Sequence, residues 1–205
     1  QEFTTKQILQ NLGAVSWWGL DGNADDEIGN NNGVLQGGVN CNANGKFGKA
    51  CEFDGINDYI NIPFSLDLLN GTIEIWMNSK SNTGSAQIFF DGDGSSGGGS
   101  SPSFEGSATG MNFYVSNSCL KSAAYTQGQW THFVGTWNGV TNSLYKNGIQ
   151  SASGGCTSTE SGFTKFTIGG RSGTLNANAT IDEVMIFNKT LTEKQVNSLY
   201  NLNLN

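Results

Sequence analysis

The segment Thr72-Ile73-Glu74-Ile75-Trp76-Met77 decides the fold class, because its aliphatic side chains occupy every second position. Side chains of a β-strand point alternately to its two faces. Ile73, Ile75 and Met77 therefore share one face, which we expect to lie in a core. We expect the other face to be an outer or concave surface on which Glu74 is solvated. The alternation predicts a strand with only one buried face.

Short apolar runs of similar kind recur along the chain between Gly- and Asn-rich turns. The predicted strands are residues 14–20, 52–62, 72–77, 86–90, 111–115, 131–137, 143–146, 163–168 and 181–187. Asn138-Gly139 and Asn147-Gly148 each supply two residues that tolerate positive φ, which is typical of antiparallel hairpins. So many strands in one chain of 205 residues predict an all-β, two-sheet antiparallel sandwich.

Two short helices and one long loop interrupt this pattern. Residues 3–12 carry apolar side chains at loosely helical spacing, which predicts a short docked helix. Near the C-terminus, Thr192 is followed three residues later by Gln195, a capping box that predicts a helix starting at Thr192. Residues 91–110 are rich in Gly and Ser and poor in apolar side chains, so we expect a long mobile loop there.

Composition excludes several kinds of partner. Charged residues make up 13% of the chain, and the net charge is -7 at pH 7. Such a chain repels a phosphate backbone and has no Lys/Arg cluster, so nucleic acid is not expected as a partner. No apolar run of about 18 residues is present, so no membrane insertion is expected. The 17 carboxylates either group around divalent cations or only keep the surface hydrated.

The four cysteines show no C-x-x-C spacing, which favours two disulfides and an oxidising, extracellular compartment over a zinc site. Cys41 and Cys51 flank a turn-rich stretch that should double back, so we expect them to pair. Cys119 and Cys156 then pair by elimination. The candidate N-glycosylation sites, each the first residue of an Asn-x-Thr sequon, are Asn70, Asn178 and Asn188.

Several short motifs follow one another in a fixed order. They are Trp18-Gly19-Leu20-Asp21-Gly22-Asn23, Phe53-Asp54-Gly55, Gln129-Trp130-Thr131-His132-Phe133, Leu144-Tyr145-Lys146-Asn147-Gly148 and Ile181-Asp182-Glu183-Val184. In this order they resemble the laminin-G-like, concanavalin A-like superfamily. The resemblance implies one two-sheet jelly-roll domain, 14–205. The N-terminal segment, 1–13, departs from the family pattern. Because this fold hosts lectins, adhesion modules, enzymes and structural subunits, it does not select a function.

Catalysis is not expected from this sequence. Glucanases that resemble this fold place two carboxylates on alternate residues of one strand, as E-x-D-x-x-E, and no such run exists here. Asp182 and Glu183 are adjacent, so their side chains should point to opposite faces. A pair from different strands, such as Glu74 with Glu183, stays open. His132 is the only histidine, and we expect it to be packed and hydrogen-bonded.

Calcium is the cofactor that the sequence favours. Asp21, Asn23, Asp25 and Asp26 supply several oxygen ligands within six residues. The family resemblance implies a structural cation site that joins this turn to the Ile-Asp-Glu-Val strand. The candidate ligands are Asp21, Asp26 and Asp182.

The aromatic side chains could also act as sugar-stacking platforms. Trp18, Trp76, Trp130 and Trp137 lie in strand motifs, so most of them should be core. Trp17 and Tyr114 are less certain and stay open as platforms.

The function predicted is a secreted, non-catalytic module that binds a glycan or an extracellular protein, stabilised by Ca²⁺. The alternative is a structural subunit of an extracellular filament or surface layer, a polymer of copies of this chain. In that alternative, residues 1–13 reach a neighbouring copy.

Overall fold

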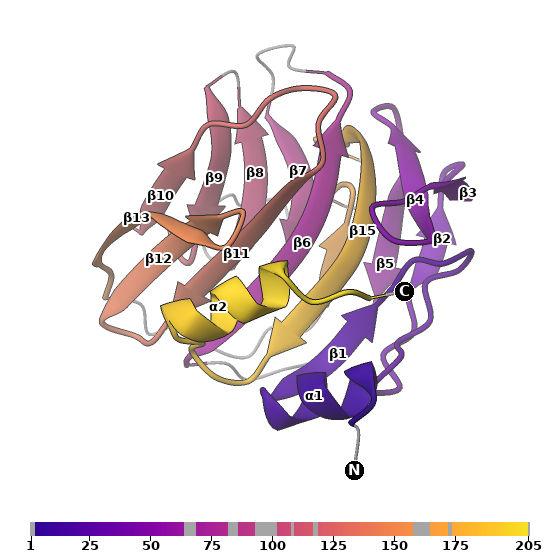
Figure 1. Cartoon of the computed structure of the whole chain (residues 1–205). Coiled ribbons are helices and arrows are strands. Elements are labelled where there is room, and N and C mark those ends of the chain that lie inside the picture. Colours follow the sequence, from indigo (N-terminus) through magenta and orange to yellow (C-terminus); the bar gives the residue numbers. More distant parts are fainter. Residues whose placement is uncertain are drawn as a thin grey trace.

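The computed structural model describes residues 3–63, 69–81, 86–92, 102–107, 109–116, 119–157, 165–171 and 174–204. Two antiparallel sheets stack on each other, and two short helices lie on the outer side of one sheet (Figure 1). The two-sheet jelly-roll prediction is therefore confirmed. Residues 163 and 164, the first two of one predicted strand, lie outside the described residues.

The first sheet has eight strands, in the order β13-β12-β11-β6-β15-β4-β3, with β1 paired to β15. These strands are β1 (Ala14–Trp18), β3 (Asn40–Asn44), β4 (Lys49–Asp54), β6 (Gly71–Ser79), β11 (Thr131–Trp137), β12 (Thr141–Lys146), β13 (Ile149–Gly155) and β15 (Asn178–Phe187). The second sheet has seven strands, in the order β10-β9-β8-β7-β14-β5-β2. These are β2 (Val34–Gln36), β5 (Tyr59–Ile62), β7 (Gln87–Asp91), β8 (Ser103–Ser107), β9 (Gly110–Tyr114), β10 (Leu120–Ala123) and β14 (Phe166–Ile168).

The main core fills the space between the two sheets. Ile73, Ile75 and Met77 on β6 all face it, as their alternation predicts. Aromatic side chains contribute most of its volume, because each one removes a large apolar area from water. The fully buried aromatic residues of this core include Trp18, Phe53, Phe90, Phe104, Phe113 and Phe133.

The prediction of a long loop over residues 91–110 is wrong in part, and residues 93–101 and 108 of it lie outside the described residues. Residues Ser103–Ser107 form β8, which pairs with β7 on one side and β9 on the other. A single apolar side chain anchors this strand, because Phe104 is fully buried in the main core and packs on Phe113. Composition hides such a strand, since Gly and Ser dominate around its one anchor.

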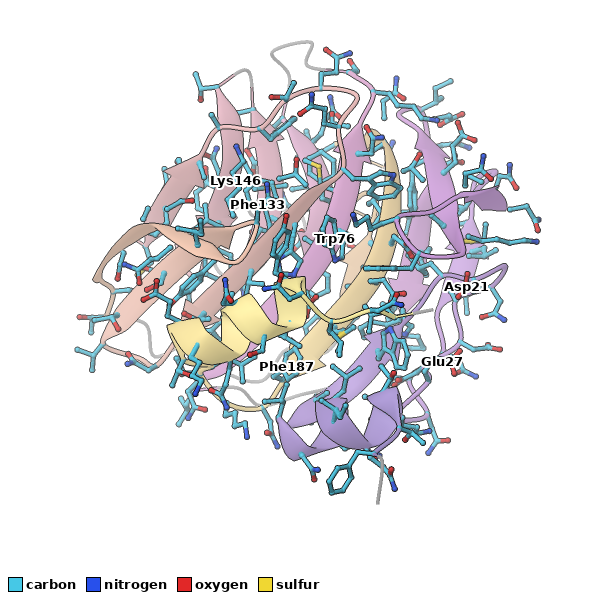
Figure 2. All side chains as sticks on the ribbon, viewed as in Figure 1. Asp21, Glu27, Trp76, Phe133, Lys146 and Phe187 are labelled. Atoms are coloured by element: carbon cyan, nitrogen blue, oxygen red, sulfur yellow. A yellow bond between two sulfur atoms is a disulfide. The ribbon has the colours of Figure 1, made fainter. Side chains whose placement is uncertain are left out.

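A second apolar cluster covers the outer side of the eight-stranded sheet. The helices α1 (Thr5–Asn11) and α2 (Glu193–Tyr200) lie over this side, where Figure 2 labels Phe187 of β15. Leu9 and Val196 pack with Phe187 in this cluster. Each helix begins with a Thr/Gln capping box, which Thr192 forms as predicted. Residues Thr5–Asn11 thus form a helix that packs on the eight-stranded sheet of the same chain. No described helix is long and apolar enough to cross a membrane.

Because the helices pack on this side, the expectation that the second face of β6 is solvated is wrong. Glu74 has 0% exposure and Trp76 has 3%, so neither is solvated. Alternation distinguishes the two faces of a strand but does not reveal what packs on each face.

The two disulfides join Cys41 to Cys51 and Cys119 to Cys156, the pairing that the sequence predicts. The first bond links neighbouring strands β3 and β4. The second links the residue before β10 to the residue after β13, and so ties one sheet to the other at their outer edges.

Candidate functional site

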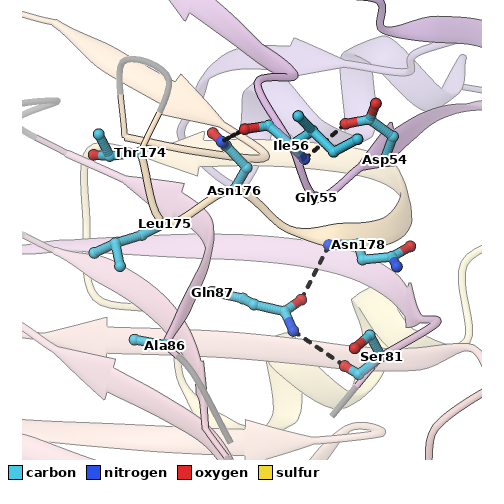
Figure 3. Close-up of a pocket in the computed structure, with 10 residues that line it drawn as sticks. All are labelled: Asp54, Gly55, Ile56, Ser81, Ala86, Gln87, Thr174, Leu175, Asn176 and Asn178. Carbon is cyan, nitrogen blue, oxygen red and sulfur yellow. Dashed lines mark hydrogen bonds between the residues drawn. The ribbon is translucent and has the colours of Figure 1, made fainter. Parts of the chain in front are cut away.

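A pocket of about 500 Å³ opens where three connections of the sandwich meet (Figure 3). The connections follow β4, join β6 to β7, and precede β15. Its lining residues are Asp54, Gly55, Ile56, Ser81, Ala86, Gln87, Thr174, Leu175, Asn176 and Asn178. This volume lies within the range of small-molecule sites, about 300–1,000 Å³.

Hydrogen bonds between the connections hold the walls of the pocket in place. The buried Gln87 side chain accepts from the Asn178 N–H at 3.0 Å and donates to the Ser81 carbonyl at 3.2 Å (Figure 3). Asn176 donates through Nδ2 to the Ile56 carbonyl at 2.5 Å. Two of these three bonds, from Gln87 to Asn178 and from Asn176 to Ile56, join segments far apart in the sequence, so the pocket is shaped before any ligand arrives.

Several polar groups of the pocket keep hydrogen-bonding capacity. Asp54 uses Oδ1 to accept from the Ile56 N–H at 2.8 Å. Within the described part of the chain, its Oδ2 and the Asn178 carboxamide have no hydrogen-bond partner. Asn176 Oδ1 is buried and also has none among these residues. These atoms offer both donors and acceptors to a polar ligand.

Two aliphatic side chains stand beside these polar groups. Ile56 is 74% exposed and Leu175 is 41% exposed. Leu175 also has a φ of 51°, in the left-handed region that non-glycine residues rarely adopt. The surrounding connections hold this unfavourable backbone, which keeps an apolar side chain exposed at the pocket.

A polar patch lies on the seven-stranded sheet near the pocket. Arg171, whose backbone pairs with the pocket residue Thr174, forms a buried ion pair with Asp91. Burial raises the pKa of the Glu105 carboxyl, and the positive charge of Arg171 offsets part of this rise. Burial and the Glu105 charge also raise the pKa of Tyr114, a residue left open as a sugar platform. Tyr114 is half-buried in this patch, so only part of its ring faces solvent.

Asp26, a predicted calcium ligand, instead organises a turn. Its Oδ1 accepts from the N–H groups of Trp17, Ile28 and Gly29, and its Oδ2 accepts from Asn31. Burial alone would raise the pKa of Asp26, but these donors outweigh it and lower the pKa. Its oxygens are occupied by backbone donors.

Asp21 and Asp182, the other two predicted ligands, lie close enough that the Asp21 charge contributes to the pKa of Asp182. Asp182 Oδ2 accepts from the N–H groups of Lys46 and Phe47 at 2.8 and 3.1 Å. Its Oδ1 is buried without a hydrogen-bond partner among the described residues. Burial, with the Asp21 charge added, raises the pKa of Asp182 to about 7.

Glu183 joins this acidic group, which corrects the expectation that Asp182 and Glu183 point to opposite faces. A β-bulge follows Asp182, and Glu183 has a φ of 51°, so the strict alternation breaks here. Trp17, the other residue left open as a sugar platform, donates through Nε1 to Glu183 at 2.5 Å. Burial and the Asp182 charge raise the pKa of Glu183 to about 9.

Within the described ranges, no three His, Cys, Asp or Glu side chains come together in a way that could hold a metal ion. The prediction that His132 is packed and hydrogen-bonded is confirmed, because its Nε2 lies 2.9 Å from Glu74 Oε1. Of the four tryptophans expected in the core, Trp130 alone is only half-buried.

Comparison with known proteins agrees with this fold. Domain 4 of AbnA, a GH43 extracellular arabinanase from Geobacillus stearothermophilus solved in complex with arabinotriose, is 21% identical with a TM-score of 0.73, and the alignment covers 92% of this chain and 99% of that one. The receptor binding domain of botulinum neurotoxin D is 14% identical with a TM-score of 0.69, over 93% of this chain and 53% of that one. Trypanosoma rangeli sialidase is 13% identical with a TM-score of 0.72, over 92% of this chain and 32% of that one.

The chain therefore spans about half of the toxin structure and a third of the sialidase. No curated protein sequence matches it significantly. The family model described as the concanavalin A-like lectin/glucanases superfamily matches residues 54–197. Because this match covers more than half of the 205 residues, the chain belongs to the concanavalin A-like lectin/glucanases superfamily.

Proposed function

We propose that this chain is a secreted, non-catalytic binding module that holds a glycan in the pocket of Figure 3. The observation that carries the proposal is the set of unused hydrogen-bonding atoms on Asp54, Asn176 and Asn178 beside the exposed Ile56 and Leu175. A sugar presents hydroxyl groups around a ring with C–H faces. The carboxylate and carboxamides suit the hydroxyls, and the aliphatic side chains suit the C–H groups.

The similar structures support binding as the role. One is a domain that holds arabinotriose within an extracellular arabinanase, and another is the receptor binding domain of a toxin. Their identities of 21% and 14% are too low to carry over a ligand or a subsite, so they do not choose the sugar. The two disulfides support secretion, because such bonds persist in oxidising compartments.

The distribution of carboxylates supports a non-catalytic role. Glycoside hydrolysis generally requires two carboxyl groups that flank the scissile bond. The described lining of the pocket contains one carboxylate, Asp54. Glu74 and Glu183, the cross-strand pair left open above, are both within 1% of complete burial. A sugar could reach these two carboxylates only if the helices and side chains that cover this side of the sheet moved away.

A calcium ion remains part of this proposal. Asp182 fits such an ion, because its Oδ1 is buried and has no hydrogen-bond partner among the described residues. Asp21, whose Oδ1 accepts from the Lys49 N–H, would add its Oδ2. Asp26 does not fit, because its oxygens serve backbone donors. Bound there, Ca²⁺ would neutralise the mutual repulsion of Asp21, Asp182 and Glu183, and its role would be structural.

The filament alternative receives less support from the structure. It relied on residues 1–13 to reach a neighbouring copy, but Leu9 of that segment is fully buried on its own domain.

A glycan array followed by calorimetric titration tests the proposed function. We expect saturable binding of at least one oligosaccharide class, with no release of reducing ends on long incubation. An array without a hit, or a hit whose affinity is unchanged when Asp54 and Asn178 are both replaced by Ala, would contradict the glycan pocket.

A further inference from the structure

A second pocket, of about 350 Å³, lies on the helix-covered side of the eight-stranded sheet. It shares no lining residue with the glycan pocket. Its lining residues are Lys46, Phe47, Trp76, Tyr200, Asn201, Leu202 and Asn203. Three of them are aromatic, and they come from the turn between β3 and β4, from β6 and from the end of α2.

The three aromatic rings of this pocket are arranged around Trp76. Phe47 meets the indole edge-on, with ring centroids 6.0 Å apart and planes at 89°. Tyr200 stacks on it, with centroids 5.6 Å apart and planes at 21°. The face of an aromatic ring carries negative charge density, so a pocket built from such rings attracts cations.

One cation of the chain already occupies the pocket. Lys46 Nζ lies 4.6 Å from the centroid of Trp76 and 5.7 Å from that of Phe47, both within the range of a cation–π contact. None of the described salt bridges involves Lys46. The rings, and not a paired carboxylate, therefore hold this ammonium group.

The walls of the pocket are fixed, whereas the Lys46 side chain is exposed. The N–H groups of Lys46 and Phe47 donate to Asp182, which anchors their turn. Val196 and Leu199 anchor α2 in the outer cluster, and so position Tyr200. A lysine ammonium is strongly hydrated, so its release into water costs little. A rotation of Lys46 would open the face of Trp76 and leave the rings in place.

We propose that this pocket binds a trimethylammonium group in place of the Lys46 ammonium. A quaternary ammonium ion is weakly hydrated and covers its charge with methyl groups, so it gains both ring contacts and burial. The net charge of -7 adds a long-range attraction for such cations. The group is carried by free choline and by phosphocholine esters, and the walls described here recognise what the two share.

Calorimetric titration with choline chloride tests this proposal on three proteins: the wild type, Lys46→Met, and the control Lys49→Met. Lys49 is an exposed lysine of the same hairpin whose Nζ donates to Asn42. Lys46→Met removes the internal competitor, so we expect choline to bind it at least about threefold more tightly than the wild type. Lys49→Met should match the wild type, and Phe47→Leu in the Lys46→Met background should weaken binding.

The neutral isostere 3,3-dimethylbutan-1-ol separates charge from shape, and we expect it to bind Lys46→Met at least about threefold more weakly than choline does. Phosphocholine titrated in parallel shows the source: binding of both compounds indicates headgroup recognition, and binding of choline alone indicates a free cation. The proposal fails if neither compound saturates a Lys46→Met protein whose circular dichroism matches the wild type. It also fails if the neutral isostere binds as tightly as choline.

Discussion

Glu74 Oε1 lies 2.9 Å from Nε2 of His132, and both side chains are sealed beneath the helix-covered side of the eight-stranded sheet. The two residues lie on the neighbouring strands β6 and β11 in a diagonal arrangement, because Glu74 pairs with Val134 and His132 pairs with Trp76. Because neither group reaches water, each is the main partner of the other in a medium of low polarity.

Loss of one partner of this pair should therefore be costly. We expect Glu74→Ala to lower the free energy of unfolding by about 1–3 kcal/mol, because the buried His132 ring loses its hydrogen-bond partner. Urea denaturation measures this change. Glu52→Ala is the matched control, since it removes an ion pair with Lys80 whose side chains are 41% exposed. That pair should contribute about 0–1 kcal/mol. Equal losses in the free energy of unfolding of the two variants would show that the Glu74–His132 contact contributes no more than an exposed ion pair.

The acidic group of Asp182 and Glu183 should make stability depend on pH. Their folded pKa values, about 7 and about 9, exceed the unfolded values near 4. The folded state therefore favours the protonated carboxyls, so their stabilising contribution is complete below about pH 4 and is lost as pH rises to about 9. Without metal, we expect Tm to fall between pH 5 and pH 9.

Glu183→Gln should flatten that fall above pH 7, because the amide cannot ionise. Thermal unfolding followed by circular dichroism in buffers with EDTA measures both proteins. A wild-type Tm that is constant or rises over this range would show that the two carboxyls are not protonated in the folded state.

Calcium should stabilise the folded protein by binding to the same acidic group. The structure distinguishes Asp182, a proposed ligand, from Asp26, which holds a turn. A cation that binds only the folded state stabilises it according to its concentration, so Ca²⁺ should raise Tm and EDTA should reverse the rise. Asp182→Ala should abolish the response. Asp26→Ala should instead lower Tm equally with and without Ca²⁺, because it removes a turn and not a ligand. Elemental analysis of the purified protein provides an independent measurement.

Much of the fold follows from the sequence because the signals are local. The alternation in Ile73, Ile75 and Met77 identifies the core face of β6, and Thr192 with Gln195 identifies the start of α2. The burial of Glu74 does not follow, because it depends on a helix more than 100 residues later in the chain. The shared direction of Asp182 and Glu183 depends on a bulge, which is set by backbone geometry and not by residue type.

The pocket of Figure 3 could not be predicted from the sequence for a related reason. Its residues come from three segments, 54–56, 81–87 and 174–178, and none of them carries a binding motif of its own. The sequence leaves Trp17 open as a sugar platform, but the Nε1 atom of Trp17 donates to Glu183. In the sequence, Asn178 is distinguished only as the first residue of a glycosylation sequon, whereas in the structure it lines the pocket.

The pocket allows a final prediction that distinguishes ligand contacts from support of the walls. Asn178→Ala removes an unpaired carboxamide, so we expect at least about tenfold weaker glycan binding, about 1.4 kcal/mol, at an unchanged Tm. Asn70→Ala, at an exposed asparagine outside the pocket, should change neither quantity. Calorimetric titration with the array hit and thermal unfolding measure the two quantities on each variant.

Gln87→Ala should behave differently, because Gln87 is buried and its amide joins the Ser81 carbonyl to the Asn178 N–H. Its removal leaves both backbone groups without this partner, so we expect a loss of about 1–3 kcal/mol in the free energy of unfolding. Glycan binding should weaken as well, because the two walls are no longer held at a fixed separation. If Gln87→Ala weakened binding without loss of stability, Gln87 would itself contact the sugar. If it lowered stability and left affinity unchanged, the walls would not position the ligand, and the pocket would lose its support as the glycan site.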